Sequence, residues 1–328
     1  MLLFFNTSKF LKKWYNKNVN GVGVMRKCVI IMNPNSGKKK KVDYKNLYDI
    51  LRKYDYDGEI KFTKASKDAI NIVKNLSNDV DLVISAGGDG TLNEVVTGNS
   101  LRDKKLTLAN LPLGTTNDVG NMYGLSKNCL KSLELLLTGK QKKIDVCTIN
   151  DNPFVYVACL GDYIDLTYNT PRELKKKYGK IAYIMYGLKQ LRNSINVYDI
   201  KYKIDGKTHK GKYSFIFITN ASRVAGVNDI YYDVKLDDKM FEVAFADIRT
   251  KKDMLKMLVQ INTMEIKEIP GITYFQTDNL QIEFLNGPKT SWCIDGEEYK
   301  STKTKFEFKV ENNMKMLLPK ANIKRLFE

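Results

Sequence analysis

The sequence predicts two structural units, an α/β unit with a parallel sheet followed by a mostly antiparallel β unit. A chain of 328 residues matches about two domains at roughly 150 residues each. At 43% hydrophobic and 28% charged residues, it has enough apolar surface to bury two cores. Strand and helix patterns alternate in the first part, and strand patterns follow one another in the second. We place an N-terminal extension at 1–24, the α/β unit at 25–143 with a C-terminal return at 311–328, and the β unit at 144–310.

The first unit begins after Met25, where buried strand patterns and helical spacings alternate. Such alternation predicts a parallel sheet covered by helices on both faces, with ligands beyond the carboxyl ends of its strands. The expected order is strand 27–32, helix 42–54, strand 59–62, helix 66–76, strand 80–85, a helix from Thr91, and strand 106–111.

The second unit shows successive strand-like runs, which predict a mostly antiparallel β domain. One long helical stretch, 171–191, interrupts them, and a short strand at 314–318 is expected to return to the first unit. The expected strands are 152–160, 197–204, 212–219, 241–246, 273–284 and 303–310.

The histidine and cysteine content excludes several kinds of site. The single histidine, His209, lies in a polar, turn-like stretch, where we expect a solvated loop. One histidine excludes a Cys2His2 zinc site and an HExxH site, and a turn histidine argues against a Ser-His-Asp triad. If the protein is an enzyme, its general base is therefore expected to be a carboxylate. The five cysteines form no CxxC pair, which favours reduced, buried thiols in a reducing cytosol.

The net charge of +17 suggests an anionic partner, whether a nucleic acid, a phosphate ligand or an acidic membrane surface. Nucleic acid is not expected, because the sequence has no helix-turn-helix, zinc or aromatic RNP signature. No apolar run reaches the roughly 18 to 20 residues of a membrane span. Aromatic residues and lysines within 1–24 could form an interfacial helix, but we favour an unstructured extension.

Three loops that follow predicted strands are small, glycine-containing and rich in hydroxyl and amide groups. They are Asn33–Lys38, Gly87–Glu94 and Gly114–Asp118. Glycine allows backbone N–H groups to approach an anion, and each loop enters a helix N-terminus, which favours phosphate. Taken singly, each is an ordinary turn, and none is a Walker A or a dinucleotide fingerprint. Three at one sheet edge predict phosphate binding, and Asp89 adds a group that can hold Mg²⁺.

Four motifs in order resemble the diacylglycerol kinase catalytic-domain family, in particular its soluble bacterial members. They are Asn-Pro-x-Ser-Gly from Asn33, Gly-Gly-Asp-Gly-Thr-Leu-Asn-Glu from Gly87, Pro-x-Gly-Thr-x-Asn-Asp from Pro112, and Asp-Gly-Glu from Asp295. By itself the Asp295-Gly296 pair indicates only a hairpin turn. The resemblance spans about 25–318 and implies a doubly wound nucleotide-binding domain like those of phosphofructokinases and NAD kinases, followed by a β-sandwich.

The resemblance also implies a role for each matching residue. Glu297, with Asp295 beside it and with Asp89, would be catalytic, Glu297 accepting the proton of the lipid hydroxyl. Asp89, Asp118 and Asp145 would position phosphates and a catalytic Mg²⁺, and the backbone carbonyls of Lys235 and Met240 with the Asp238 carboxylate would hold a structural Mg²⁺. ATP would be bound by Asn33, Pro34, Asn35, Ser36, Gly37, Thr63, Gly88, Asp89, Gly90, Thr91, Leu92, Asn93, Glu94, Thr115 and Asp118.

By this resemblance the protein is expected to be an ATP- and Mg²⁺-dependent kinase of diacylglycerol, cytoplasmic and bound peripherally to anionic membranes, with dimers common among relatives. A basic, aromatic stretch, Lys175–Tyr186, is one candidate membrane contact, and Lys38–Lys41 could instead attract ATP. The alternatives are a kinase of another lipid alcohol or a sphingoid base, and a catalytically silent lipid-binding relative. NAD is disfavoured as acceptor, because Asn312-Asn313 is not followed by glutamate.

Two departures from the family pattern concern the β unit. Lys239 stands where the structural-metal segment usually has glycine, and the strand around Tyr156 lacks a common asparagine. Both departures lie in the unit that is expected to bind the acceptor.

Overall fold

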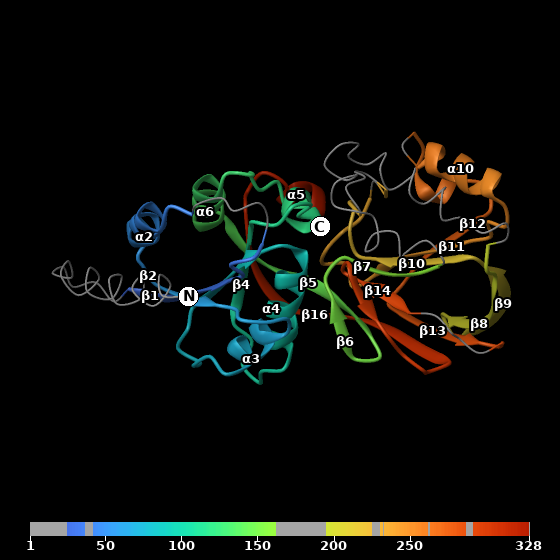
Figure 1. The fold of residues 1–328 in the computed structure, drawn as a ribbon, viewed down its shortest axis with the longest axis horizontal. Coiled ribbons are helices and arrows are strands. Elements are labelled where there is room, and N and C mark those ends of the chain that lie inside the picture. Colours follow the sequence, from blue (N-terminus) through green and yellow to red (C-terminus); the bar gives the residue numbers. More distant parts are fainter. Residues whose placement is uncertain are drawn as a thin grey trace.

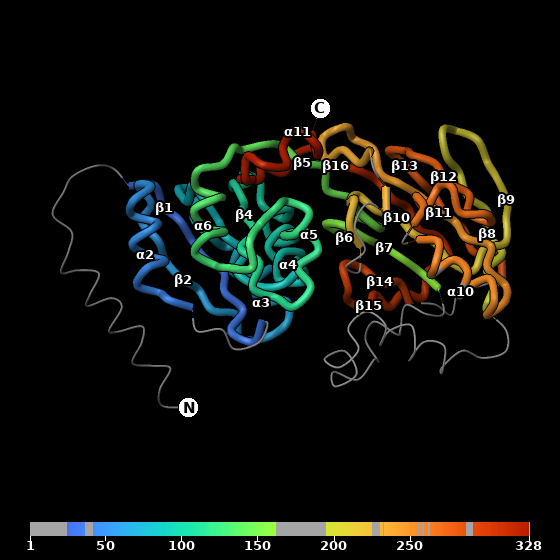
Figure 2. Tube along the Cα trace, turned by 90° about the horizontal axis from the view of Figure 1, so that it is seen from above, coloured from blue at the N-terminus to red at the C-terminus, as the bar shows by residue number. Residues whose placement is uncertain are grey.

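The computed structural model describes residues 25–36, 42–161, 195–224, 230–231, 233–261, 263–286 and 291–327. Two units lie side by side along the long axis, the α/β unit at one end and the β-rich unit at the other (Figure 1). Seen from above, the same two units remain distinct, and strands β5 and β16 run from one into the other (Figure 2). The architecture confirms the predicted fold class of α/β followed by β.

The α/β unit is built on four parallel strands in the order β2-β1-β3-β4. β1 and β3 are almost wholly buried, as expected for central strands covered on both faces. The order places β1 and β3 in the middle, so the loops that follow them open at the same edge. The strands are β1 (Arg26–Met32), β2 (Tyr56–Phe62), β3 (Leu82–Gly87) and β4 (Thr107–Pro112).

Helices cover both faces of this sheet, with α2 and α6 on one side and α3 and α4 on the other (Figure 1). Local capping fixes two of their starts. The Asp43 carboxylate accepts a hydrogen bond from the Asn46 N–H at 3.1 Å, and Asn128 does the same for Lys131. The helices are α2 (Tyr44–Lys53), α3 (Asp68–Lys74), α4 (Asp89–Ser100), α5 (Asp118–Met122) and α6 (Cys129–Leu137).

Two long strands, β5 (Lys140–Ile149) and β16 (Lys305–Leu318), connect the units. β16 pairs with β4 of the first unit and with β13 of the second, and it runs antiparallel to β5 over its length. The expectation of separate strands at 303–310 and 314–318 was wrong, because a bulge between Asn312 and Met314 lets one strand continue. The boundaries predicted at 143 and 310 therefore fall inside strands that both units share. The short helix α11 (Ile323–Leu326) follows β16.

The β-rich unit packs two sheets face to face. The large sheet continues as β16-β13-β8-β9, and the second sheet has the order β12-β11-β10-β7-β14-β15. Large apolar side chains such as Trp292, Phe241 and Phe308 are fully buried between them. The remaining elements are β6 (Asn152–Phe154), β7 (Val157–Leu160), β8 (Tyr198–Ile204), β9 (Lys207–Tyr213), β10 (Phe215–Thr219), β11 (Phe241–Ala246), α10 (Lys251–Gln260), η1 (Ile266–Glu268), β12 (Ile272–Thr277), β13 (Asn279–Phe284), β14 (Trp292–Ile294) and β15 (Glu297–Tyr299).

Three strands predicted as continuous are each broken, and the two halves join different sheets. The run 152–160 divides into β6 and β7, the run 212–219 into β9 and β10, and the run 273–284 into β12 and β13. In the first case the backbone N–H groups of residues 155–157 donate to the Asp295 carboxylate and not to a neighbouring strand. A chain that changes sheets in this way closes the corner of a sandwich.

His209 was expected in a loop but lies in β9, where its ring stacks on Tyr202 at 5.2 Å between centroids. The turn that joins β8 to β9 has Asp205 and Gly206 both at positive φ, as in a tight β-hairpin. All five cysteines are free thiols, and four are buried. None of the described helices has the length and apolar character needed to span a membrane. The predicted helix 171–191, with the membrane contact proposed in it, and the extension 1–24 lie outside the described residues.

Candidate active site

The second and third glycine loops touch through their backbones. A Cβ built on Gly114 would lie only 2.6 Å from Gly88 Cα, so a side chain at this position would force the loops apart. The N–H groups of Leu113 and Gly114 both donate to the Gly87 carbonyl, at 2.7 and 3.1 Å. The two loops therefore form one continuous backbone surface beyond β3 and β4.

The first loop joins the same edge. The Asn33 N–H donates to the Ala86 carbonyl at 3.1 Å, and the Asn33 side-chain amide lies 3.5 Å from Thr91 Oγ1. Pro34 and Asn35 are exposed and Ser36 is half-buried, while Gly37 lies outside the described residues. Thr63 is buried beside this loop, its N–H donating to the Met32 carbonyl at 2.9 Å. The structure thus brings the three predicted loops together.

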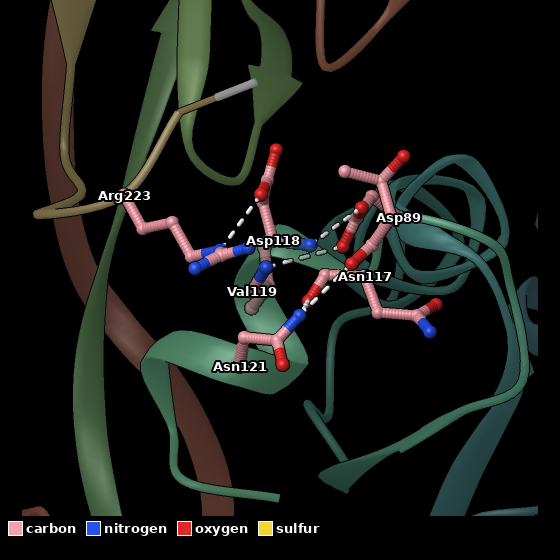
Figure 3. Close-up of polar contacts among 7 residues, drawn as sticks. Asp89, Asn117, Asp118, Val119, Asn121 and Arg223 are labelled. Carbon is pink, nitrogen blue, oxygen red and sulfur yellow. Dashed lines mark hydrogen bonds and ion pairs between the residues drawn. The ribbon is translucent and has the colours of Figure 1, made fainter. Parts of the chain in front are cut away.

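Asp89 lies at the centre of the loops, at the start of α4 (Figure 3). Its two carboxylate oxygens accept hydrogen bonds from the Asp118 N–H at 2.9 Å and the Val119 N–H at 3.2 Å. Burial raises the pKa of Asp89 to about 6, the two N–H groups partly oppose that shift, and the charge of Asp118 adds to it. Asp89 therefore fixes the third loop, and its pKa lies closer to neutral pH than that of an ordinary aspartate.

Asp118 is paired with a residue of the other unit. Arg223 Nε lies 2.9 Å from Asp118 Oδ1, and the Asp118 side chain is only 2% exposed (Figure 3). Arg223 follows β10, and its neighbour Ser222 is anchored by a hydrogen bond from the Ile230 N–H. The β-rich unit thus places a cation against the nucleotide-binding loops of the predicted site.

Asp295 is buried and fully engaged in hydrogen bonds. Its carboxylate accepts three backbone N–H groups, those of Val155, Tyr156 and Val157, at 2.6 to 3.0 Å. The Asn93 side-chain amide, from α4, donates a fourth bond at 2.8 Å and also binds the Pro153 carbonyl. Burial raises the pKa of Asp295, and these four donors oppose the shift. Such an arrangement suits a residue that positions the β14–β15 hairpin more than one that accepts protons.

Glu297 follows the Asp295-Gly296 turn and is exposed. A Cβ built on Gly90 would lie 3.5 Å from Glu297 Oε1, so the carboxylate lies over the start of α4. Partial burial raises the pKa of Glu297, and the charge of Glu94 raises it further. An open carboxylate with a raised pKa beside the glycine loops can accept a proton from a bound substrate.

Other residues that were predicted to bind ATP are held in the fold by contacts of their own. The Glu94 carboxylate accepts the N–H groups of Lys67 and Ala69, at 2.8 and 3.2 Å, and so caps α3. Leu92 is fully buried in the core, so only its backbone can face a ligand. Thr115 is exposed on the third loop.

Asp145 lies against the segment predicted to hold a structural Mg²⁺. Its carboxylate accepts the Lys239 N–H at 2.7 Å and the Asn312 side-chain amide at 2.6 Å, and its N–H donates to the Leu236 carbonyl. Lys239 has φ +61°, so the turn keeps a left-handed residue although glycine is absent. Among the described residues, the Asp145 carboxylate is thus hydrogen-bonded to this segment and to Asn312, and not to Asp89 or Asp118.

The two predicted Mg²⁺ sites differ in their donor sets. Among the described residues, no three Asp, Glu, His or Cys side chains converge closely enough to form a protein-only metal site. Mg²⁺ at a phosphate site needs only one or two carboxylates, because phosphates and water fill the remaining positions. Asp89, whose oxygens retain acceptor capacity, fits this role. In the other segment, Asp238 Oδ1 already accepts the Met240 N–H at 3.0 Å, and Lys235 Nζ donates to the Arg325 carbonyl.

Comparison with known proteins places the chain in a family. Residues 27–149 match the model of the diacylglycerol kinase catalytic domain. The diacylglycerol kinase of Bacillus subtilis is 32% identical over 248 residues, which cover 74% of this chain and 80% of that protein. The chain belongs to the diacylglycerol kinase family. Members of this family are kinases, and the resemblance drawn from the four motifs is confirmed.

Further relatives are similar to this chain over most of its length. A diacylglycerol kinase of Staphylococcus aureus is 27% identical over 83% of this chain and 86% of its own. A crystal structure of a diacylglycerol kinase from Bacillus anthracis superposes with a TM-score of 0.73 at 24% identity, covering 92% of this chain and all of that one. At this identity, the solved structure supports the fold of this family member.

Two residues near the carboxylates carry no motif in the sequence. Arg223 lies after β10 in a stretch without a recognisable pattern, and Tyr156 was noted only for a missing asparagine. Burial raises the pKa of Tyr156 well above its usual value, and the charges of Asp295 and Asp89 add to the shift. The pairing of β7 with β14 and the hydrogen bond from the Tyr156 N–H to Asp295 bring Tyr156 to the site, and no pattern along the chain indicates either contact.

Proposed function

We propose that this kinase transfers the γ-phosphoryl group of ATP to the free hydroxyl of diacylglycerol, giving phosphatidic acid for phospholipid synthesis. The observation that carries the proposal is the position of Glu297 Oε1 over Gly90 at the start of α4. A carboxylate from the β-rich unit then faces the glycine loops of the α/β unit. This geometry suits an acceptor hydroxyl held between a base and a triphosphate.

The proposed reaction divides the work between the two units. Backbone N–H groups of the glycine loops, together with the helix N-terminus of α4, bind the phosphates. Glu297 accepts the hydroxyl proton as the acceptor oxygen bonds to the γ-phosphorus and the bond to the β-phosphate oxygen breaks. Asp295 holds the hairpin that carries Glu297, and Asn93 fixes that hairpin to α4.

Mg²⁺ is part of this proposal, with Asp89 as its carboxylate and Asp118 as a second group beside it. When bound, the ion neutralises the charge of the phosphate oxygens. We also infer a structural Mg²⁺ at Lys235–Met240, near the carboxylate of Asp145.

The acceptor is a membrane lipid, so we propose peripheral association with an anionic bilayer on the cytoplasmic side. The net charge of +17 supports this, because each basic residue near such a surface contributes about 1 kcal/mol. A homodimer, which the resemblance implies, is a further proposal that sedimentation of the purified chain would test.

An acceptor panel tests the function. Purified protein, γ-labelled ATP and Mg²⁺ are mixed with micelles that contain diacylglycerol, monoacylglycerol or a sphingoid base. We expect the label to enter phosphatidic acid and to be absent with Asp89→Asn, a variant close in shape to wild type. Label in the sphingoid base alone would identify the acceptor as a different lipid. Turnover by Asp89→Asn at the wild-type rate would contradict the mechanism.

A further inference from the structure

The proposed reaction gathers several negative charges at the site, which the proposed Mg²⁺ offsets from the side of Asp89. Asp89, Asp118 and Glu297 are carboxylates beside loops that must receive a triphosphate. Like charges at this range repel each other, and a partly buried site screens them poorly. A cation supplied by the protein at the point of transfer would offset this repulsion.

Arg223 lies where such a cation is needed. Among the ion pairs between described residues, Arg223–Asp118 is the one that joins the two units. Its Nε lies 2.9 Å from Asp118 Oδ1, Asp118 is adjacent to the N–H groups that bind Asp89, and the Arg223 side chain is 19% exposed. The guanidinium is therefore close to the glycine loops and still reachable from solvent.

The chemistry of arginine fits this position. A guanidinium is a planar fork of five N–H donors, so it can bind a carboxylate and a phosphate oxygen together. The base of Arg223 is fixed to the β-rich unit, because the Ser222 carbonyl accepts the Ile230 N–H and the Asn220 N–H donates to the Tyr156 carbonyl. The side chain consequently reaches from the acceptor side toward the nucleotide side.

We propose that Arg223 is a catalytic residue that binds the γ-phosphate of ATP while Asp118 orients its guanidinium. The inference rests on the proposed function, because it assumes that a nucleoside triphosphate occupies the glycine loops. Its role is to stabilise the charge of the transferred phosphoryl group. Glu297 and Arg223 then act on the acceptor and the phosphate from the same unit.

The experiment compares Arg223→Gln with Arg249→Gln. Arg249 also forms an arginine–aspartate pair, with Asp247 at 2.7 Å, but on the exposed surface of the β-rich unit. We expect Arg223→Gln to lower kcat by about 10²- to 10³-fold, as the loss of a transition-state charge contact does. Arg249→Gln is expected to keep the wild-type rate.

Direct titration with ATP and ADP separates this role from a structural one. A γ-phosphate contact predicts that Arg223→Gln weakens ATP binding about tenfold and leaves ADP binding unchanged. Equal weakening of both nucleotides, or a kcat within threefold of wild type, would overturn the proposal. Because Arg223→Gln removes an ion pair of the buried Asp118 and so can destabilise the fold, Arg223→Lys serves as a second variant. Lysine keeps the positive charge but lacks the forked guanidinium group. We therefore expect Arg223→Lys to retain the preference for ATP over ADP with a reduced kcat. Loss of that preference would also overturn the proposal.

The same titration distinguishes the inference from the proposed function. If wild-type protein prefers ATP and Arg223→Gln does not, but diacylglycerol receives no phosphate, the inference stands and the acceptor assignment fails. If diacylglycerol is phosphorylated and the preference survives in Arg223→Gln, the function stands and the inference fails.

Discussion

The two sides of the candidate site are built from different parts of the polypeptide. On the α/β side the surface is mainly backbone, because Gly88 and Gly114 lie so close together that a side chain on Gly114 would clash with Gly88. On the β-rich side the surface consists of side chains, with Glu297, Arg223 and Tyr156 extending from strands and loops fixed elsewhere. Backbone N–H groups recognise phosphate without regard to the rest of the ligand, whereas side chains provide charge and proton transfer.

The carboxylates of Asp89 and Asp295 differ in a similar way, one being able to bind a ligand and the other serving to hold the structure. Asp89 accepts hydrogen bonds from two backbone N–H groups and has a pKa raised to about 6, while Asp295 accepts four hydrogen bonds at the turn of a hairpin. One carboxylate remains able to bind a further group, and the other is consumed in positioning. The reactive arrangement therefore exists only when the hairpin of one unit lies against α4 of the other.

Removal of the proposed base gives the largest expected effect. Glu297→Gln keeps the size of the side chain but cannot accept the hydroxyl proton, so we expect kcat to fall by about 10³-fold. Initial rates with saturating ATP and diacylglycerol measure it. Glu298→Gln is the matched control, because Glu298 is the next residue of β15 and pairs with Lys300 at the surface. A Glu297→Gln enzyme with more than a third of the wild-type rate would show that the base lies elsewhere.

The contact between the units is tested by Asn93→Ala. This change removes the amide that binds the buried Asp295 carboxylate, and a hydrogen bond to a charged group contributes about 1.5 to 3 kcal/mol. We expect kcat to fall by about 10- to 100-fold, because the hairpin that carries Glu297 loses its link to α4. The midpoint of thermal unfolding should fall as well.

Asn128→Ala is the control for stability alone. Asn128 caps α6 far from the hairpin, and loss of such a cap costs about 1 kcal/mol. It is expected to lower the melting temperature and leave kcat intact. If Asn93→Ala behaves in the same way, the bridge between the units has no part in catalysis.

Much of the α/β unit could be predicted from the sequence because its elements have a strong period. Strands buried on both faces are continuous apolar runs, and β1, β3 and β4 lie within two residues of their predicted ends. The three glycine loops follow such strands, so their meeting at one edge was also predictable. Helix α6 and strand β5 were missed, since polar residues open β5 at Lys140–Lys143.

The β-rich unit was predictable in kind but not in pairing. An apolar alternation shows that a strand exists, but it does not show where the chain leaves one sheet for another. The breaks occur at positions such as Ser214, whose N–H and hydroxyl both bind the Ala246 carbonyl, and Asp278. The same limit applies to the site, because the motifs identified Asp89 and Glu297, whereas Arg223 reaches Asp118 only through tertiary contact.

The smallest expected effect is the pH dependence of nucleotide binding. The folded protein holds the pKa of Asp89 at about 6, above the ordinary carboxyl value of 3.8, so protons compete with Mg²⁺–nucleotide below that pH. Lowering the pH from 7 to 5 reduces the ionised fraction of Asp89 about tenfold, and the affinity for Mg²⁺–ADP should fall by the same factor. Titration calorimetry across this range measures it. Asp89→Asn should bind weakly and with little dependence on pH, because it has no proton to lose. A wild-type affinity that stays constant from pH 7 to 5 would mean that Asp89 shapes the third loop without facing the phosphates, and the contrast with Asp295 would disappear.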